Sequence, residues 1–141
     1  MSHYFADLKA AIKDIIKTQS THAKNAAIYD YEETQPAGYP AITITPVEGQ
    51  GEFLDTMRNR RDSTFKVLCM QERVEVGASE SERILTQLVD ELLLIFESSP
   101  NYNLENTDVF TLPPRVKWGY MTVPDAEVRS CELTITAVTA Q

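Results

Sequence analysis

The chain has 141 residues, of which 43% are hydrophobic, and a formal net charge of −8. One domain of this length can bury roughly two thirds of its unfolded surface. The acidic balance argues against a protein that coats nucleic acid, because phosphate binding needs clustered lysine and arginine. No signal region opens the chain and no apolar run approaches the ~18 residues of a membrane span, so we expect a protein made in the cytoplasm, without a membrane partner.

The first half of the chain predicts one helix and two strands. Apolar side chains spaced three and four positions apart indicate a helix over residues 3–18. A short strand is expected over 26–31, and a second, alternating strand over 41–45. Pro40 and Pro46 bracket the second strand and should fix its length, because proline cannot donate to a ladder.

Residues 47–62 contain two glycines, four acids and three arginines. We interpret them as a long charged loop or as the tip of an extended hairpin, since a loop of this length is usually functional or disordered. The predicted contact surface for a neighbouring subunit or another partner chain consists of Phe53, Leu54, Asp55, Met57, Arg58, Arg60 and Arg61. Arginine suits such a surface because its planar fork pairs bidentately with carboxylates. A solvated hairpin explains the same charges equally well. A nucleic-acid contact is the third alternative, although three arginines flanked by Asp55 and Asp62 make a poor track for phosphates.

A long strand is expected over residues 64–76, followed by a long amphipathic helix over 79–97. Ser79 and Glu82 have the spacing of a capping box, which would satisfy two backbone N–H groups at the start of the helix. The apolar stripe of this helix is wide, which is typical of core packing and also leaves a part that can face another subunit.

Three further strands are expected over residues 108–112, 116–123 and 128–139. The last of them alternates cleanly, which is typical of an antiparallel sheet with one wet face. Its apolar face consists of Cys131, Leu133, Ile135 and Ala137. Trp118 is expected in the core. The order helix, strands, helix, strands predicts one α+β domain over residues 1–141, with a mainly antiparallel sheet and two helices packed on one face.

No pattern in the sequence indicates a catalytic centre, a metal site or a cofactor. His3 and His22 have no second ligand at a useful spacing. Cys69 and Cys131 fall in expected strands, so buried free thiols are the simpler interpretation. The glycine patterns of nucleophile elbows and phosphate loops are missing. We therefore expect a protein that is not an enzyme.

With its parts in this order, the chain resembles the tail terminator proteins of long-tailed bacteriophages. The resemblance rests on an opening helix, the YPAITITP strand, the segment DTMRNRRDSTFKVLCM, the helix SESERILTQLVDELLLIF and the closing strands KWGYMTV and RSCELTITAV. It implies a ring of copies, commonly a hexamer, in the tail neck of a virion assembled in the host cytoplasm. Such a ring ends the tail tube, stops its polymerisation and joins the tail to the head connector.

The resemblance also implies the partners: further copies of this chain, the tail tube protein and a head connector or neck protein. DNA would pass the lumen without specific binding. Related neck proteins share a similar α+β shape, so a neighbouring neck position is one alternative. A stand-alone module that binds a peptide or small ligand on its sheet face is another, and an enzyme with a dispersed site is a third. The mass in solution separates a ring from a module, whereas an enzyme should have a deep pocket with perturbed acids.

Overall fold

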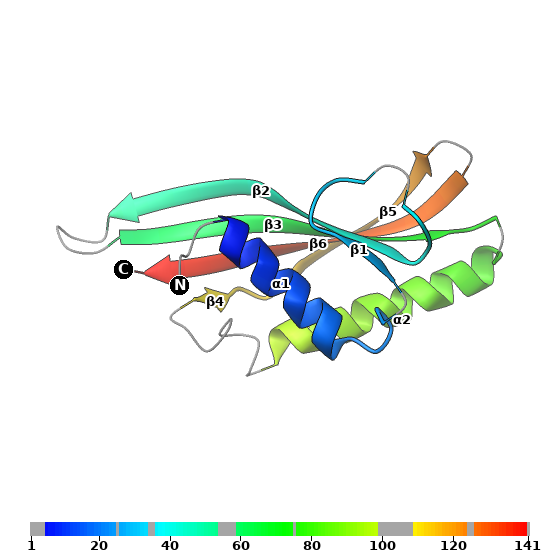
Figure 1. Cartoon of the computed structure of the whole chain (residues 1–141), viewed down its shortest axis with the longest axis horizontal. Coiled ribbons are helices and arrows are strands. Elements are labelled where there is room, and N and C mark those ends of the chain that lie inside the picture. The colour runs from blue at the N-terminus through cyan, green and yellow to red at the C-terminus, as the bar shows by residue number, and fades with distance from the viewer. Residues whose placement is uncertain are drawn as a thin grey trace.

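The computed structural model describes residues 5–24, 26–33, 36–53, 59–74, 76–98, 109–123 and 126–140. In chain order the elements are α1 (Phe5–Gln19), β1 (Ala27–Tyr29), β2 (Ala41–Phe53), β3 (Asn59–Glu72), α2 (Ala78–Glu97), β4 (Phe110–Thr111), β5 (Arg115–Val123) and β6 (Ala126–Ala140). Figure 1 shows a long sheet with both helices on one side. Within the described ranges, no helix is long and apolar enough to cross a membrane.

The six strands form one sheet in the order β1-β2-β3-β6-β4, and β5 also pairs with β6. Among these described strands, the β1–β2 pair is parallel and the other pairs are antiparallel. Since β3 occupies one side of β6, β4 and β5 follow one another along its other side. The predicted α+β fold with a mainly antiparallel sheet is confirmed.

Both helices pack on the same face of this sheet, here called the helix face. Their fully buried side chains include Leu8, Ile12, Ile16, Leu85, Leu88 and Leu92. They form one cluster with alternate residues of β2, β3 and β6, among them Ile42, Ile44, Phe65, Val67, Cys131, Leu133, Ile135 and Ala137. The face of β6 predicted from its alternation therefore lies in the core.

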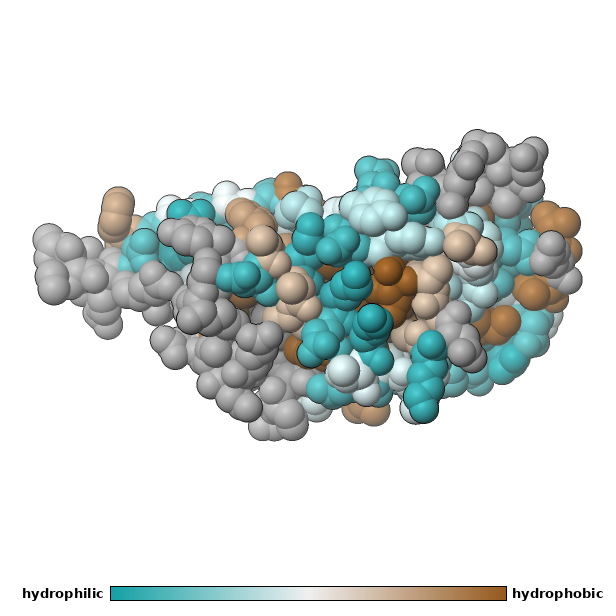
Figure 2. All heavy atoms as spheres, viewed as in Figure 1, coloured by the Kyte–Doolittle hydropathy of each residue, from teal (hydrophilic) through white to brown (hydrophobic). Residues whose placement is uncertain are grey.

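The opposite face of the sheet, here called the open face, has a smaller apolar cluster of its own. Its buried members are Ala41, Leu68, Met70 and Val128, with Ala27, Tyr39 and Met121 packed against them. The segment between β1 and β2 supplies Tyr39, so a connection covers part of this face where no helix does. Figure 2 has the view of Figure 1, with α1 in front of the sheet, and so shows the helix side, where hydrophilic side chains cover much of the coloured surface and hydrophobic ones lie among them.

The strand predicted to stop before Pro46 continues to Phe53. A β-bulge between Pro46 and Glu48 takes up the irregularity, and β1 pairs with β2 only over Ala41–Thr43. Proline is tolerated on an edge and at a bulge because no ladder hydrogen bond is lost there. The long loop predicted at about 47–62 is thus wrong for 47–53 and 59–62, where the hairpin alternative is correct, while 54–58 lies outside the described residues.

The start of α2 also differs from the prediction. Its N-cap is Gly77, at φ 86°, in the left-handed region that favours glycine, and no side chain caps the helix. The capping box expected from Ser79 and Glu82 is wrong, because the Glu82 carboxylate accepts hydrogen bonds from Arg129 of β6 instead. A long-range ion pair has replaced the local contact.

A carboxylate on α2 ties the two helices together. Glu91 accepts hydrogen bonds from the Ser20 hydroxyl, from the Thr21 hydroxyl at 2.6 Å and from the His22 backbone N–H at 3.0 Å. Burial acts to raise the pKa of Glu91, but these hydrogen bonds outweigh it, and the pKa is lowered. The segment that follows α1 is thereby fixed against the middle of α2.

Candidate functional site

The distal parts of β2 and β3, residues 47–53 and 59–63, extend past α1 and are here called the arm (Figure 1). The end of β6, up to Ala140, pairs with β3 along this arm. Its base is anchored by Phe5 of α1, whose ring lies 5.7 Å from that of Phe65. A Cβ atom at Gly49 would lie 2.6 Å from Phe5 Cζ, so only glycine leaves room for this ring. The arm is therefore joined to the core at its base and leaves it toward its tip.

The arm presents an exposed aromatic ring and a row of charges. Phe53 is 84% exposed. The Arg60 guanidinium donates to both Asp62 oxygens, at 2.9 and 3.2 Å, and stands opposite Glu52 in the register. Hydrogen bonding to Asp62 raises the pKa of Arg60, so this arginine stays charged throughout the ordinary pH range. Together with Gln50, these charged side chains line a hollow of about 250 Å³ on the open face.

Three of the seven residues predicted as a contact surface lie on the described arm, namely Phe53, Arg60 and Arg61. The other four, Leu54, Asp55, Met57 and Arg58, lie outside the described residues. Arg60 finds its carboxylate partner in its own strand, although the sequence suggested one on a neighbouring subunit. The Arg61 guanidinium lies beside Gly51, and its backbone oxygen accepts a hydrogen bond from Thr139 of β6.

A cluster of arginines and aromatic rings lies on the helix face of β5, beside the first half of α2. The Arg129 guanidinium is 4.5 Å from the Tyr120 ring centroid and 5.1 Å from that of Trp118. Arg73 approaches the Tyr120 ring at 5.1 Å. Arg129 also pairs with Glu82, its Nε lying 2.8 Å from the carboxylate. These contacts hold the rings in place while leaving them accessible.

The prediction that Trp118 lies in the core is wrong, because this side chain is 38% exposed. Trp118 does stand on the helix face, opposite Cys131 of β6. Since β5 is at the edge of the sheet, α2 does not cover it fully, and Leu94 of α2 is itself 72% exposed. The alternation of KWGYMTV indicates which side chains share a face, but it does not indicate whether that face is covered.

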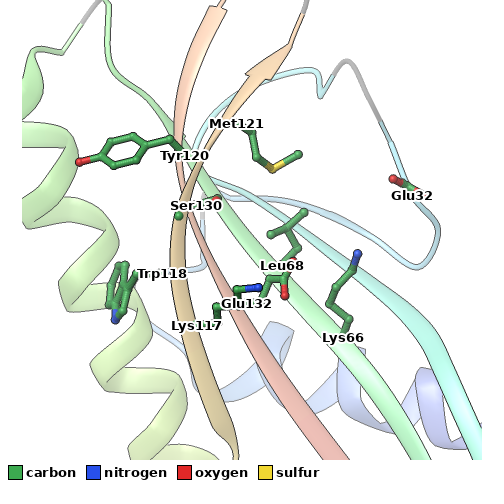
Figure 3. Close-up of a pocket in the computed structure, with 10 residues that line it drawn as sticks. Glu32, Lys66, Leu68, Lys117, Trp118, Tyr120, Met121, Ser130 and Glu132 are labelled. Carbon is green, nitrogen blue, oxygen red and sulfur yellow. The ribbon is translucent and has the colours of Figure 1, made fainter.

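A groove of about 260 Å³ lies on the sheet near β5. Its lining comprises Glu32, Lys66, Leu68, Lys117, Trp118, Gly119, Tyr120, Met121, Ser130 and Glu132. Figure 3 shows that the Trp118 and Tyr120 rings lie toward α2, while Lys66, Leu68 and Met121 lie on the other side of β5. The side chains of the groove thus combine an apolar floor with charges of both signs, which suits a small polar group or a peptide.

The chemistry available to these surfaces is that of binding. Among the residues that the structure describes, no group of three or more potential metal ligands comes together. The prediction of buried free thiols is confirmed, and Cys69 stands opposite Cys131 in the register of β3 and β6. Burial raises the pKa of Cys131 to about 11 and also raises that of Cys69, so both thiols are protonated and poor nucleophiles at neutral pH.

No model of a known protein family matches the chain, and no curated protein matches it at a significant level.

Proposed function

We propose that this chain is a structural virion protein that forms a ring at the end of a phage tail tube. The ring stops tube polymerisation and joins the tail to the head connector. The observation that supports this proposal most is the arm, which leaves the helix-covered core and exposes Phe53 at its end. An aromatic ring held in solvent on an ordered strand gains stability when another chain covers it.

A second surface lies at the other end of the molecule. The exposed rings of Trp118 and Tyr120 sit on β5, which pairs with the half of β6 remote from the arm. Tyrosine, tryptophan and arginine are the side chains most enriched in the energetic centres of interfaces. When a subunit has two different contact surfaces, one surface can bind the other surface of the next copy. Such heterologous contacts close into a ring when the rotation between copies allows.

The charge of the chain agrees with a passage for DNA. The net charge is −8. An acidic wall repels the phosphate backbone and so keeps DNA from sticking while it moves. This point supports a lumen position.

The experiment that tests the proposed function is a tube-length assay. Tail tube protein would be polymerised alone and with the purified chain, and tube lengths would be compared by electron microscopy. The proposal predicts shorter tubes, with added density at one end, in proportion to the amount of chain. Tubes of unchanged length without end density, formed beside a chain of intact helix content, would refute the tail terminator function.

The groove favours a second candidate function, a stand-alone binding module for a peptide or small ligand. Its side chains join Leu68 and Met121 with Lys66, Lys117 and Glu132, a composition suited to a partner with both polar and apolar groups. A chain that stays monomeric and binds a peptide saturably would favour this function. For a binding module, replacing Leu68 by Lys should abolish peptide binding. The ring function makes no such prediction for this substitution.

A further inference from the structure

Among the residues that the structure describes, two edges of the sheet have no partner strand over long stretches. Beyond Thr43, the outer side of β2 pairs with no other described strand, and this includes the whole arm strand 47–53. The outer side of β5 is likewise without a described partner strand, since β5 pairs only with β6. Open edges of this kind accept a further strand readily, because their N–H and C=O groups point outward as a template.

The charges along the two edges are opposite in sign and lie on the same face. Glu48 and Glu52 stand opposite Thr64 and Arg60 of β3, on the open face, and both are exposed. Arg115 and Lys117 are exposed and stand opposite residues of β6 that also face the open side. Side chains alternate between faces along a strand, so each edge presents its charges in one row, acidic on the arm and basic on β5.

The helix face of the two edges differs in side-chain size. The arm edge presents Gly49 and Gly51 there, whereas β5 presents Val116, Trp118 and Tyr120. The Phe5 ring lies beside Gly49 and the Arg61 guanidinium beside Gly51, so a large side chain of an added strand would pack against these two groups. Opposite charges meet when one edge lies against the other with like faces together.

We propose that the arm of one copy adds to β5 of the next copy as an antiparallel strand, with Glu52 opposite Arg115 and Gly49 opposite Trp118. This inference rests on the proposed ring function and names the contact that closes the ring. The cross-strand pair of opposite charges, Glu52 with Arg115, then repeats once in every interface. The partner is a second copy of this chain because both matching edges belong to the same molecule.

The directions of the strands agree with this contact. Every pairing across β2, β3, β6 and β5 is antiparallel, so β2 and β5 run in opposite directions. Copies related by rotation about a ring axis consequently bring β2 and β5 together as antiparallel neighbours. In an antiparallel ladder, the outward-pointing N–H and C=O groups of a strand belong to alternate residues, which share one face of the sheet. Because three antiparallel pairings separate β2 from β5, these residues lie on the same face at both edges. The two edges can therefore hydrogen-bond with their open faces on the same side.

The offset between the edges is also of the size that a closed sheet needs. Lys117 lies level with Thr43 across the sheet, whereas the proposed register places it opposite Gln50, roughly 20 Å farther along the strand. Four strands span roughly 19 Å. The resulting tilt of about 45° agrees with the 35–45° that is typical of closed β-barrels.

Disulfide cross-linking of copies tests the register directly. The double variant Glu52→Cys/Arg115→Cys should form covalent ladders on mild oxidation, because opposed Cα atoms of an antiparallel pair lie within disulfide range. The native thiols are buried and need no removal. The matched control is Glu52→Cys/Lys17→Cys, since Lys17 is exposed on α1, away from β5. It should give no ladder.

A charge exchange supplies the second measurement. Glu52→Arg and Arg115→Glu should each weaken self-association roughly tenfold in sedimentation experiments at low salt. The double variant that exchanges the two charges should recover most of the loss. Rings that form without ladders, or whose association the reversals leave unchanged, would overturn the edge contact while leaving the ring intact. A chain that stays monomeric at every concentration would overturn both the contact and the proposed function.

Discussion

The packing of α2 on the sheet can be tested by replacing Leu88 with Ala. Leu88 is fully buried in the cluster that joins both helices to the sheet, and its neighbours along the stripe, Leu85 and Leu92, are fully buried as well. A site enclosed in this way collapses little when a side chain is shortened, so the loss combines the transfer free energy with a cavity cost. We expect the free energy of unfolding to fall by about 3 kcal/mol. For a chain of this size, that corresponds to a melting temperature lower by roughly 10 °C.

The matched control lies on the same helix. Leu94 is 72% exposed, so Leu94→Ala removes the same atoms without opening a buried cavity. It should change the free energy of unfolding by less than about 0.5 kcal/mol. Urea titrations followed by far-ultraviolet circular dichroism would measure both variants at one protein concentration, because assembly makes stability concentration-dependent. Equal losses for the two variants, or a loss below about 0.5 kcal/mol for Leu88→Ala, would refute the packing described here.

Three further predictions concern charges and thiols. Glu91→Gln should lower the free energy of unfolding by about 1–2 kcal/mol at neutral pH. Because the pKa of Glu91 is lower in the folded state than in the unfolded state, this loss should shrink as pH falls below 4.5. A loss that does not depend on pH would exclude the hydrogen bonds to the Glu91 carboxylate as its cause. Cys69 and Cys131 should react with a thiol reagent only after unfolding, and reductant should leave the melting temperature unchanged. A large fall of the melting temperature on reduction would indicate a disulfide. Reversing Arg60 and Arg61 to Glu should leave melting nearly intact, because the Arg60–Asp62 pair is exposed. The reversal adds acid beside Glu52, on the edge that meets Arg115, so it should not weaken self-association. A loss of assembly that is largest at low salt would instead place these arginines against carboxylates of the next copy.

The parts of the fold that could be predicted from the sequence are those set by local periodicity. The apolar stripe of α2 and the alternation of β6 each identify a buried face without reference to the rest of the chain. The end of β2 could not be predicted in this way. Pro46 ends a central strand but is tolerated at a bulge on an edge, and which of the two applies depends on the neighbours that β2 acquires on folding.

Long-range contacts account for the other differences. Glu82 has the spacing of a capping box, but Arg129 competes for its carboxylate from a strand 47 positions later in the chain. Trp118 has the composition of a core residue, yet β5 lies at the sheet edge, where α2 covers it only in part. Local sequence patterns do not contain this information.

The candidate site was predictable only in part for the same reason. The charges of residues 47–62 pointed to a contact surface, and Phe53, Arg60 and Arg61 do lie on the projecting arm. The cluster around Arg129 and the groove near β5 combine side chains from elements far apart in the chain. Neither could be found until the register of the sheet was known.

The proposed closure of copies of this chain into a ring can be tested by the mass of the purified protein in solution. Native mass spectrometry and light scattering should give one discrete species at a fixed multiple of 15.9 kDa, the multiple of six being the one expected from the resemblance to tail terminators. Images of that species should show closed rings. A single species of 15.9 kDa at all concentrations, or open chains of continuously increasing length, would contradict the closure of copies into a ring.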